Sequence, residues 1–149
     1  MPWMTPAVRL VLMGALLGSA VPWTQGHAQD CTPPHRIQIL DLDMVPDPIE
    51  RGKTVEAWRV TLQSDRNGEC STALEIRDAD QIAGRSAKHL IRPGKGAYTV
   101  QAAPGYQFRG RDHCFQVQAN VGGTFTPLEA QRTFCARDKS GHRWSLKER

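Results

Sequence analysis

The side chains that could do chemistry in this sequence are chiefly its four cysteines and five histidines. Cysteine and histidine together could hold zinc, but such sites bring ligands about two to four residues apart in the chain. His27 falls in a predicted leader, and the other histidines, His35, His89, His113 and His142, do not show that spacing. The sequence therefore predicts no metal site, and it contains no motif for a cofactor.

His113 could act as a general base if a carboxylate and a serine stood beside it. Asp112 is the neighbouring carboxylate in the chain, but the sequence has no Gly-x-Ser-x-Gly motif and its serines lie in polar stretches. We therefore expect no catalytic residue, and the chain is predicted not to be an enzyme.

The N-terminus is typical of a secretory leader. Arg9 precedes an uncharged run from Leu10 to Val21, Pro22 ends the run, and small residues lead up to a cleavage point after Ala28. The apolar run is shorter than the roughly 20 residues that a membrane-spanning helix needs. We predict a signal peptide over residues 1–28 and an exported product, periplasmic or secreted, with no stable membrane anchor. Loss of Arg9 lowers the formal charge from +4 to +3.

The stretch from residue 113 to residue 136 has the alternation of two half-buried strands. Phe115, Val117, Ala119 and Val121 share one face, and Leu128, Ala130, Phe134 and Ala136 share another. A single antiparallel register pairs Val121 with Leu128, Ala119 with Ala130, Phe115 with Phe134 and Cys114 with Cys135. The same register places Arg132 opposite Val117, where its charge must reach water.

An even number of cysteines in an exported chain predicts two disulfides, although four cysteines allow three connectivities. The hairpin register brings Cys114 opposite Cys135. Cys31 precedes the first strand and Cys70 follows the second, so antiparallel strands would place both at the same end of the domain. We predict the bridges Cys31 with Cys70 and Cys114 with Cys135.

Further strands are expected over residues 36–45, 55–63, 71–77 and 98–102, with a short edge strand between residues 81 and 91. The first strand changes phase once, which predicts either a bulge or a strand that crosses from one sheet to another. Trp58 is expected at the centre of the core. No helical periodicity is present, so we predict an all-β, disulfide-stabilised antiparallel β-sandwich of about seven strands over residues 29–136. Residues 137–149 form a basic tail with one aromatic residue, Trp144, which could lie on a membrane or partner surface or be disordered, and we expect it to be disordered.

Two groups of residues are candidate partner contacts. One is a basic rim, defined as Arg85, Lys88, Arg92, Lys95, Arg109 and Arg111; the other is a pair of loop aromatics, Phe108 and Phe125, expected to be exposed. The rim could attract an anionic glycan or an acidic face of an envelope protein. The alternative is an ordinary solvated surface that protects an edge strand. We expect no nucleic-acid partner for an exported protein.

The stretch from Val45 to Val121 resembles bacterial immunoglobulin-like domains of the cell-adhesion-related type, often abbreviated CARDB. The resemblance is carried by the segments at residues 46–55, 58–62, 74–76, 90–94 and 114–119. It implies an immunoglobulin-like sandwich that binds or displays and has no activity of its own. Such domains usually lack a four-cysteine framework and often occur in tandem.

These observations favour an exported, non-enzymatic binding or adhesion module of the bacterial envelope. One alternative is a structural accessory subunit that offers its edge strand to a larger envelope complex. A small-ligand carrier or a hydrolase ranks last, because either would need a concave pocket with converging polar groups.

Overall fold

The computed structural model describes residues 29–31, 36–110, 113–121, 123–128 and 132–149, and every regular element within them is a β-strand. The strands are β1 (Ile37–Val45), β2 (Ile49–Glu50), β3 (Ala57–Ser64), β4 (Cys70–Thr72), β5 (Leu74–Asp78), β6 (Gln81–Arg85), β7 (His89–Ile91), β8 (Gly94–Ala102), β9 (Cys114–Val121), β10 (Thr124–Pro127), β11 (Phe134–Ser140) and β12 (Arg143–Glu148). The predicted leader, residues 1–28, lies outside the described residues, as do Arg111, Asp112 and Ala130.

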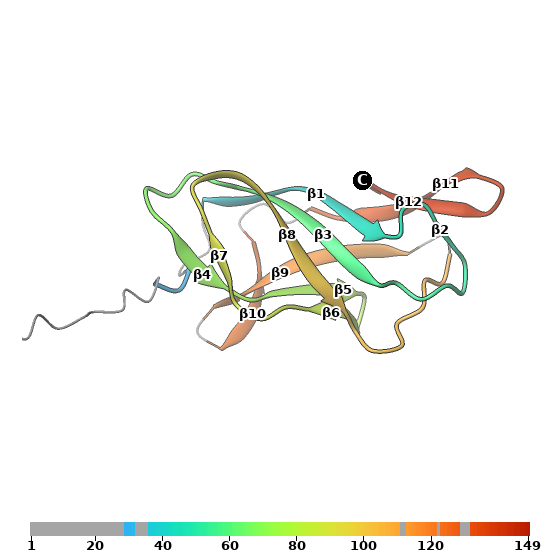
Figure 1. Cartoon of the computed structure of the whole chain (residues 1–149), viewed down its shortest axis with the longest axis horizontal. Helices are drawn as coiled ribbons and strands as arrows, with labels where there is room; N and C mark the ends of the chain where they lie inside the picture. The colour runs from blue at the N-terminus through green and yellow to red at the C-terminus, as the bar shows by residue number, and fades with distance from the viewer. Residues whose placement is uncertain (1–28, 32–35, 111–112, 122, 129–131) are drawn as a thin grey trace, which may run out of the picture.

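One large antiparallel sheet has the order β1-β3-β8-β6-β5-β9-β11-β12-β2, with β10 attached to β9. The sheet curls until β1 lies against β12, so that it nearly closes into a barrel (Figure 1). Strands β4 and β7 form a separate two-stranded sheet. The all-β antiparallel class is confirmed. The prediction of a two-sheet sandwich of about seven strands is not, because a single curved sheet encloses most of the core.

Trp58 of β3 is completely buried inside the curled sheet, as predicted. Its Nε1 donates a hydrogen bond of 3.0 Å to the carbonyl oxygen of Ala83. Its ring lies 4.8 Å from that of Phe115 and 5.9 Å from that of Tyr106, measured between ring centroids. Aromatic residues from β3, β9 and the segment after β8 thus share one cluster at the centre of the core.

The predicted bulge in the first strand is present in β1. The register against β3 shifts at Leu40, which is only half-buried. Ile37 and Ile39 before the shift and Leu42 and Met44 after it all point into the core. One unpaired residue therefore allows two phases of apolar residues to face the same interior.

Both predicted disulfides are present. Cys31 is bonded to Cys70 with a Cα separation of 4.9 Å, and Cys114 to Cys135 with a Cα separation of 4.0 Å. No free cysteine remains. Two disulfides in a chain of this size indicate an oxidising compartment outside the cytoplasm.

The predicted register between residues 113 and 136 is right at one end and wrong at the other. Cys114 pairs with Cys135 and Phe115 with Phe134, as expected. At the other end, Val121 pairs with Thr124, because β10 turns back at once on β9. The expected pairing of Val121 with Leu128 is therefore wrong.

No described strand pairing joins Arg132 to Val117, and the Arg132 side chain is not buried in the core. Val117 pairs with Ile76 of β5, which supplies an apolar neighbour. Arg132 precedes β11, and its Nη1 lies 3.3 Å from Oε2 of Glu148. The guanidinium thus reaches the surface and a carboxylate rather than the interior.

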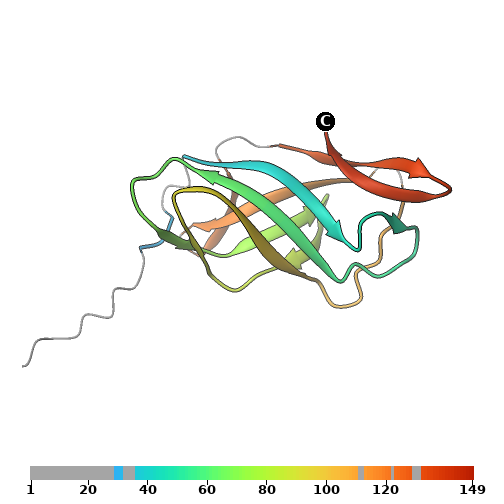
Figure 2. The same ribbon diagram turned by 45° about the horizontal axis from the view of Figure 1, so that its top comes forward.

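Two further expectations are corrected. Residues 81–85 form β6, which pairs with both β5 and β8 and is therefore not an edge strand. The C-terminal tail is not disordered, because β11 continues to Ser140 and β12 returns to Glu148 (Figure 2). The expected domain boundary at residue 136 falls inside β11. Trp144 and Leu146 pack against the core and hold this hairpin to the domain.

Candidate ligand-binding cleft

The end of the domain that carries the hairpin β11–β12 is built from three segments that are distant in sequence. Strand β2 pairs with β12, placing Ile49 opposite Trp144 and Glu50 opposite Arg143. The segment after β2 then runs beside the segment after β8. Their backbones are joined by hydrogen bonds from Gly52 N to Phe108 O at 2.7 Å and from Phe108 N to Lys53 O at 2.9 Å. Because β2 pairs with Arg143 and Trp144, next to the turn of the hairpin, these bonds place both loops beside the turn end of the hairpin.

Asp78, the last residue of β5, is the centre of a polar cluster at this end. Its side chain is 3 % exposed. One oxygen, Oδ2, accepts from the Tyr106 hydroxyl at 2.7 Å, from Arg109 Nη2 at 2.9 Å and from His113 Nδ1 at 2.9 Å. The positive charge of the Arg109 guanidinium offsets the cost of burying the Asp78 carboxylate, and the three hydrogen bonds replace those that Oδ2 would make to water.

The cluster also affects the Tyr106 hydroxyl. Burial raises the pKa of Tyr106 far above its ordinary value, and the hydrogen bond to Asp78 and the negative charge of that carboxylate raise it further. Arg109 acts in the opposite direction. Tyr106 therefore stays a neutral hydrogen-bond donor that ties the loop after β8 to the end of β5.

His113 is oriented by this cluster in a way that the sequence did not reveal. Facing a carboxylate, Nδ1 donates and Nε2 is left as the basic nitrogen, which is the arrangement of histidine in acyl-transfer triads. An open pocket of about 330 Å³ lies beside it. Of the described residues that line this pocket, Thr133 carries the only hydroxyl group, and the sulfur of Cys114 is bonded to Cys135.

No described hydrogen bond joins Thr133 to His113. Asp112, the neighbouring carboxylate in the chain, lies outside the described residues, and the carboxylate that faces His113 is that of Asp78. Within the described residues the cluster ties Tyr106, Arg109 and His113 to the end of β5.

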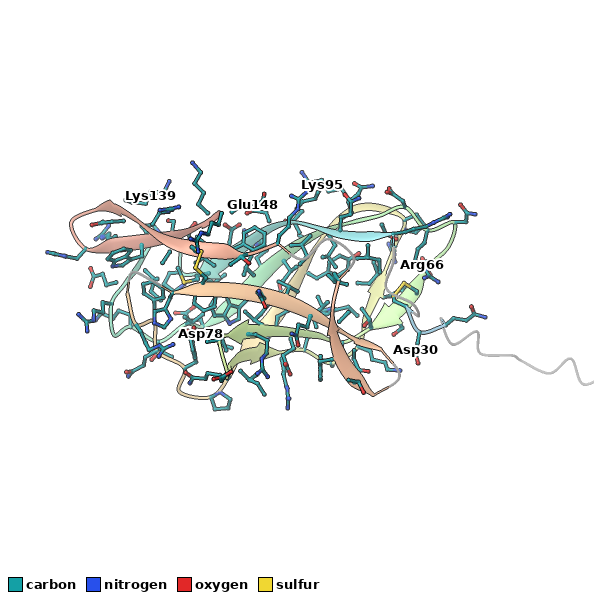
Figure 3. All side chains as sticks on the ribbon, turned by 180° about the vertical axis from the view of Figure 1, so that it is seen from behind. Asp30, Arg66, Asp78, Lys95, Lys139 and Glu148 are labelled. Atoms are coloured by element: carbon teal, nitrogen blue, oxygen red, sulfur yellow. A yellow bond between two sulfur atoms is a disulfide. The ribbon has the colours of Figure 1, made fainter. Side chains whose placement is uncertain are left out.

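A larger cleft of about 550 Å³ opens next to this cluster. Its lining consists of Arg51, Arg109, Gly110, Asp138, His142 and Trp144. The first three come from the two loops, and the last three come from the hairpin β11–β12. Figure 3 labels Asp78 and Lys139, which lie toward this end of the molecule, and Asp30 and Arg66, which lie toward the other. The cleft therefore joins positively charged, acidic and aromatic groups from three segments, of which the first and the last are 87 to 93 residues apart in the sequence.

The principal side chains of the cleft are held in place. Arg109 is bonded to Asp78. Gly110 has a φ of +105°, and a Cβ built on it would lie 3.4 Å from Cδ of Arg51, so the stem of Arg51 lies against this glycine. Trp144 is half-buried, and its ring centroid is 6.3 Å from that of Phe108. These contacts fix the positions of Arg51, Arg109 and Trp144, whose side chains remain partly exposed to solvent.

The residues of the predicted basic rim are not brought together. Arg85 Nε lies 2.6 Å from Glu75, Lys88 Nζ lies 2.7 Å from Asp30, and Arg92 Nε lies 3.6 Å from Glu69. These ion pairs offset much of the charge that would attract an anion. Lys95 is exposed near the start of β8, where it pairs with Gln63, and it lies well away from Lys139 near the turn of the hairpin (Figure 3). Arg111 lies outside the described residues. Of the six, Arg109 alone is among the described residues that line the cleft.

The two predicted aromatic anchors have different environments. Phe108 is completely buried, so the expectation that it is an exposed anchor is wrong. It packs between Trp144 and His113, with centroid separations of 6.3 and 6.4 Å. Phe125 is half-buried, and the guanidinium carbon of Arg85 lies 5.3 Å from its ring centroid. The aromatic that reaches a cleft is instead Trp144, whose sequence signal was its place among basic residues.

Among the described residues, no group of three or more histidine, cysteine, aspartate and glutamate side chains is arranged to hold a metal ion. A helix long and apolar enough to cross a membrane is also absent from this part of the chain. Comparison of the chain with models of protein families, with curated proteins and with solved structures found no match.

Proposed function

We propose that this protein is an exported, non-enzymatic binding module whose ligand occupies the cleft between the hairpin β11–β12 and the loops after β2 and β8. One observation carries the proposal: two arginines and an indole from separate segments converge on one open cleft of about 550 Å³. Arginine and tryptophan are the side chains most enriched at binding hot spots. The two disulfides support export.

An adhesion or display role in the bacterial envelope is the form of this function that we favour. It draws on the resemblance of residues 45–121 to immunoglobulin-like domains of the CARDB type. The antiparallel all-β architecture is compatible with that resemblance, although the curled sheet departs from two packed layers. A fold alone assigns no function, so the proposal rests mainly on the cleft.

A second function is favoured by the edge of β1. Among the described strands, this nine-residue strand ends the sheet and is hydrogen-bonded to β3 alone, although β12 lies near its other side. An unpaired strand edge can accept a strand from another protein, as an accessory subunit of an envelope complex would require. The two functions differ in where a partner binds.

Nuclear magnetic resonance of the exported, ¹⁵N-labelled protein distinguishes them. Envelope polysaccharide and envelope protein fractions are titrated separately, and amide shifts are mapped on the chain. We expect saturable shifts at residues 51, 109–110 and 138–144, lost in Arg51→Gln and retained in Lys95→Gln. Amide shifts confined to residues 37–45 would show that the partner binds at the edge of β1 and not in the cleft. The absence of saturable shifts with every fraction would overturn the binding proposal.

A further inference from the structure

We infer that the cleft recognises a carboxylated sugar unit within an acidic polysaccharide. This inference rests on the proposed binding function and names the chemical class of its ligand. It follows from the positive charge, the aromatic surface, the acceptor group and the open shape of the cleft.

The charge of the cleft selects an anion. Arg51 is exposed, and no acidic side chain among the described residues lies within ion-pair distance of it. Arg109 shares its charge with Asp78, but its side chain is still 54 % exposed. A guanidinium can bind both oxygens of a carboxylate through two parallel hydrogen bonds. Arg51 is therefore the principal carboxylate-binding residue, and Arg109 assists it.

The aromatic surface selects a ligand with an apolar face. Trp144 lines the cleft and is backed by the buried ring of Phe108, 6.3 Å away between centroids. The C–H groups on one face of a pyranose ring can lie flat on an indole, which contributes contact area at little entropic cost. A phosphate or sulfate group alone would leave this face unused.

Asp138 supplies the complementary acceptor. It is exposed on β11, directly opposite Trp144 in the register of the hairpin. An ionised carboxylate accepts hydrogen bonds and repels other anions, so it suits sugar hydroxyl groups rather than a second carboxylate. An acceptor beside the aromatic and a guanidinium across the cleft match one sugar ring that bears both kinds of group.

The open shape of the cleft favours a unit inside a chain. The cleft is open to solvent and not an enclosed cavity, so the bound ring can carry further sugar units that extend into the solvent. Its base is held by the bond of Arg109 to Asp78 and by the packing of Arg51 on Gly110. Preorganised groups lose less freedom on binding, which suits a weak, repeated contact with a polysaccharide.

The test uses the exported protein and four defined polymers. Polygalacturonate carries carboxylated rings, and its fully methyl-esterified form has the same rings without charge. Poly-glutamate has carboxylates without sugar, and dextran sulfate has charged sugars without carboxylates. Affinity is measured by isothermal titration calorimetry and by the change in tryptophan fluorescence, at two salt concentrations.

We expect polygalacturonate to bind at least tenfold more tightly than the other three polymers. Arg51→Gln removes the principal carboxylate-binding group and should weaken that binding about tenfold, which corresponds to about 1.4 kcal/mol. Trp144→Phe keeps an aromatic ring on Phe108 and should weaken binding by a smaller factor. Lys95→Gln removes the same charge outside the cleft and should leave binding unchanged.

Equal binding of poly-glutamate or dextran sulfate would overturn the inference, as would equal losses in Arg51→Gln and Lys95→Gln, because both outcomes mean general attraction of anions. If none of the four polymers binds, but an envelope fraction still shifts the amide signals of residues 51 and 138–144, the proposed ligand class is wrong and the proposed binding function stands. Unfolding curves of each variant show whether the fold is retained.

Discussion

Arg109 donates a hydrogen bond of 2.9 Å to Oδ2 of Asp78 and at the same time lines the cleft beside Arg51. The polar cluster at the end of β5 and the proposed ligand site thus share one side chain. Because Asp78 is buried and also accepts from Tyr106 and His113, it holds the loop after β8 in the position that shapes the cleft.

Asp78→Asn tests this link. Asparagine has nearly the same shape but no charge, so one oxygen can no longer bind three donors as strongly. Arg109 is half-exposed and can be solvated again, which limits the cost. We expect a loss of about 1–3 kcal/mol in the free energy of unfolding, measured with urea. Asp80→Asn, in the exposed turn after β5, is the matched control and should change little.

The same variant should weaken ligand binding at the cleft, because Arg109 and the loop after β8 lose their anchor. Amide exchange of residues 103–110 should also become faster. Unchanged stability and unchanged exchange in Asp78→Asn would show that the loop is held by its other contacts, such as the buried Phe108.

The disulfide between Cys114 and Cys135 holds the hairpin β11–β12 against β9. Those two strands share only two residue pairs, Cys114 with Cys135 and Phe115 with Phe134. Replacing both cysteines by alanine should cost roughly 3 kcal/mol for a bridge that spans 21 residues, by loop-closure entropy. Because the hairpin carries Trp144, binding at the cleft should weaken as well.

Replacement of Cys31 and Cys70 by alanine is the control, because that bridge joins the N-terminal segment to β4. It should lower stability and leave the affinity of the folded protein unchanged. Hydrogen exchange read separately for residues 134–148 and for residues 70–72 reports which region loosens. Equal loss of affinity in both double variants would contradict a specific role for Cys114 with Cys135.

Gly84 of β6 has no space for a side chain. A Cβ on this residue would lie 2.7 Å from the carbonyl oxygen of Gln101 and 2.7 Å from Cδ1 of Trp58. Gly84→Ala must therefore displace β8 or the central indole, and we expect a loss of about 1–3 kcal/mol in unfolding free energy. Gly68→Ala is the control, because a Cβ there would meet nothing within 4 Å. Similar stability of the two variants would mean that Trp58 and β8 can move to make room for the added methyl group at little cost in free energy.

Asp43 of β1 should make the domain less stable at neutral pH. Burial raises the pKa of Asp43 above its ordinary value of 3.8, Asp41 and Asp47 raise it further, and Arg59 lowers it. The folded state therefore binds the proton more tightly than the unfolded state, and stability falls as pH rises from 3.8 through the raised pKa.

Asp43→Asn removes this titration. The variant should be more stable than the original protein at pH 7 by less than about 1 kcal/mol, because solvent screens a group that is only half-buried. The difference should shrink as the pH falls through the raised pKa, because the original carboxyl then becomes protonated. Thermal unfolding at several pH values measures it, with Asp80→Asn as a control. A variant less stable at pH 7 would mean that the attraction to Arg59 outweighs the cost of burial.

Local patterns were sufficient for much of the fold. The phase change in residues 37–44 predicted the bulge of β1, because alternation reports directly which face of a strand is buried. The matched phases around Cys114 and Cys135 predicted their bridge. The position of Trp58 on an apolar face predicted the centre of the core. Each of these depends on neighbours within one strand or one hairpin.

The curvature of the sheet and the candidate site could not be predicted in this way. An alternating strand fits a flat sandwich layer as well as a barrel wall, and only long-range pairing decided that β6 lies inside the sheet. Phe108 was expected at the surface because its Gly-rich surroundings do not show that Trp144 covers it. The last strand was missed because the charges of residues 137–149 outweigh Trp144 and Leu146 in the pattern.

What the sequence determined by itself is therefore the all-β class, the two disulfides and the central tryptophan, since these follow from periodicity and cysteine chemistry over short spans. What only the tertiary structure decided is the cluster on Asp78 and the cleft beside it. Asp78 lies 28 to 35 residues from the three side chains that bond to it, and Arg51 meets the hairpin β11–β12 only when the sheet has curled. No local pattern encodes such a meeting, because it depends on the path of the whole chain.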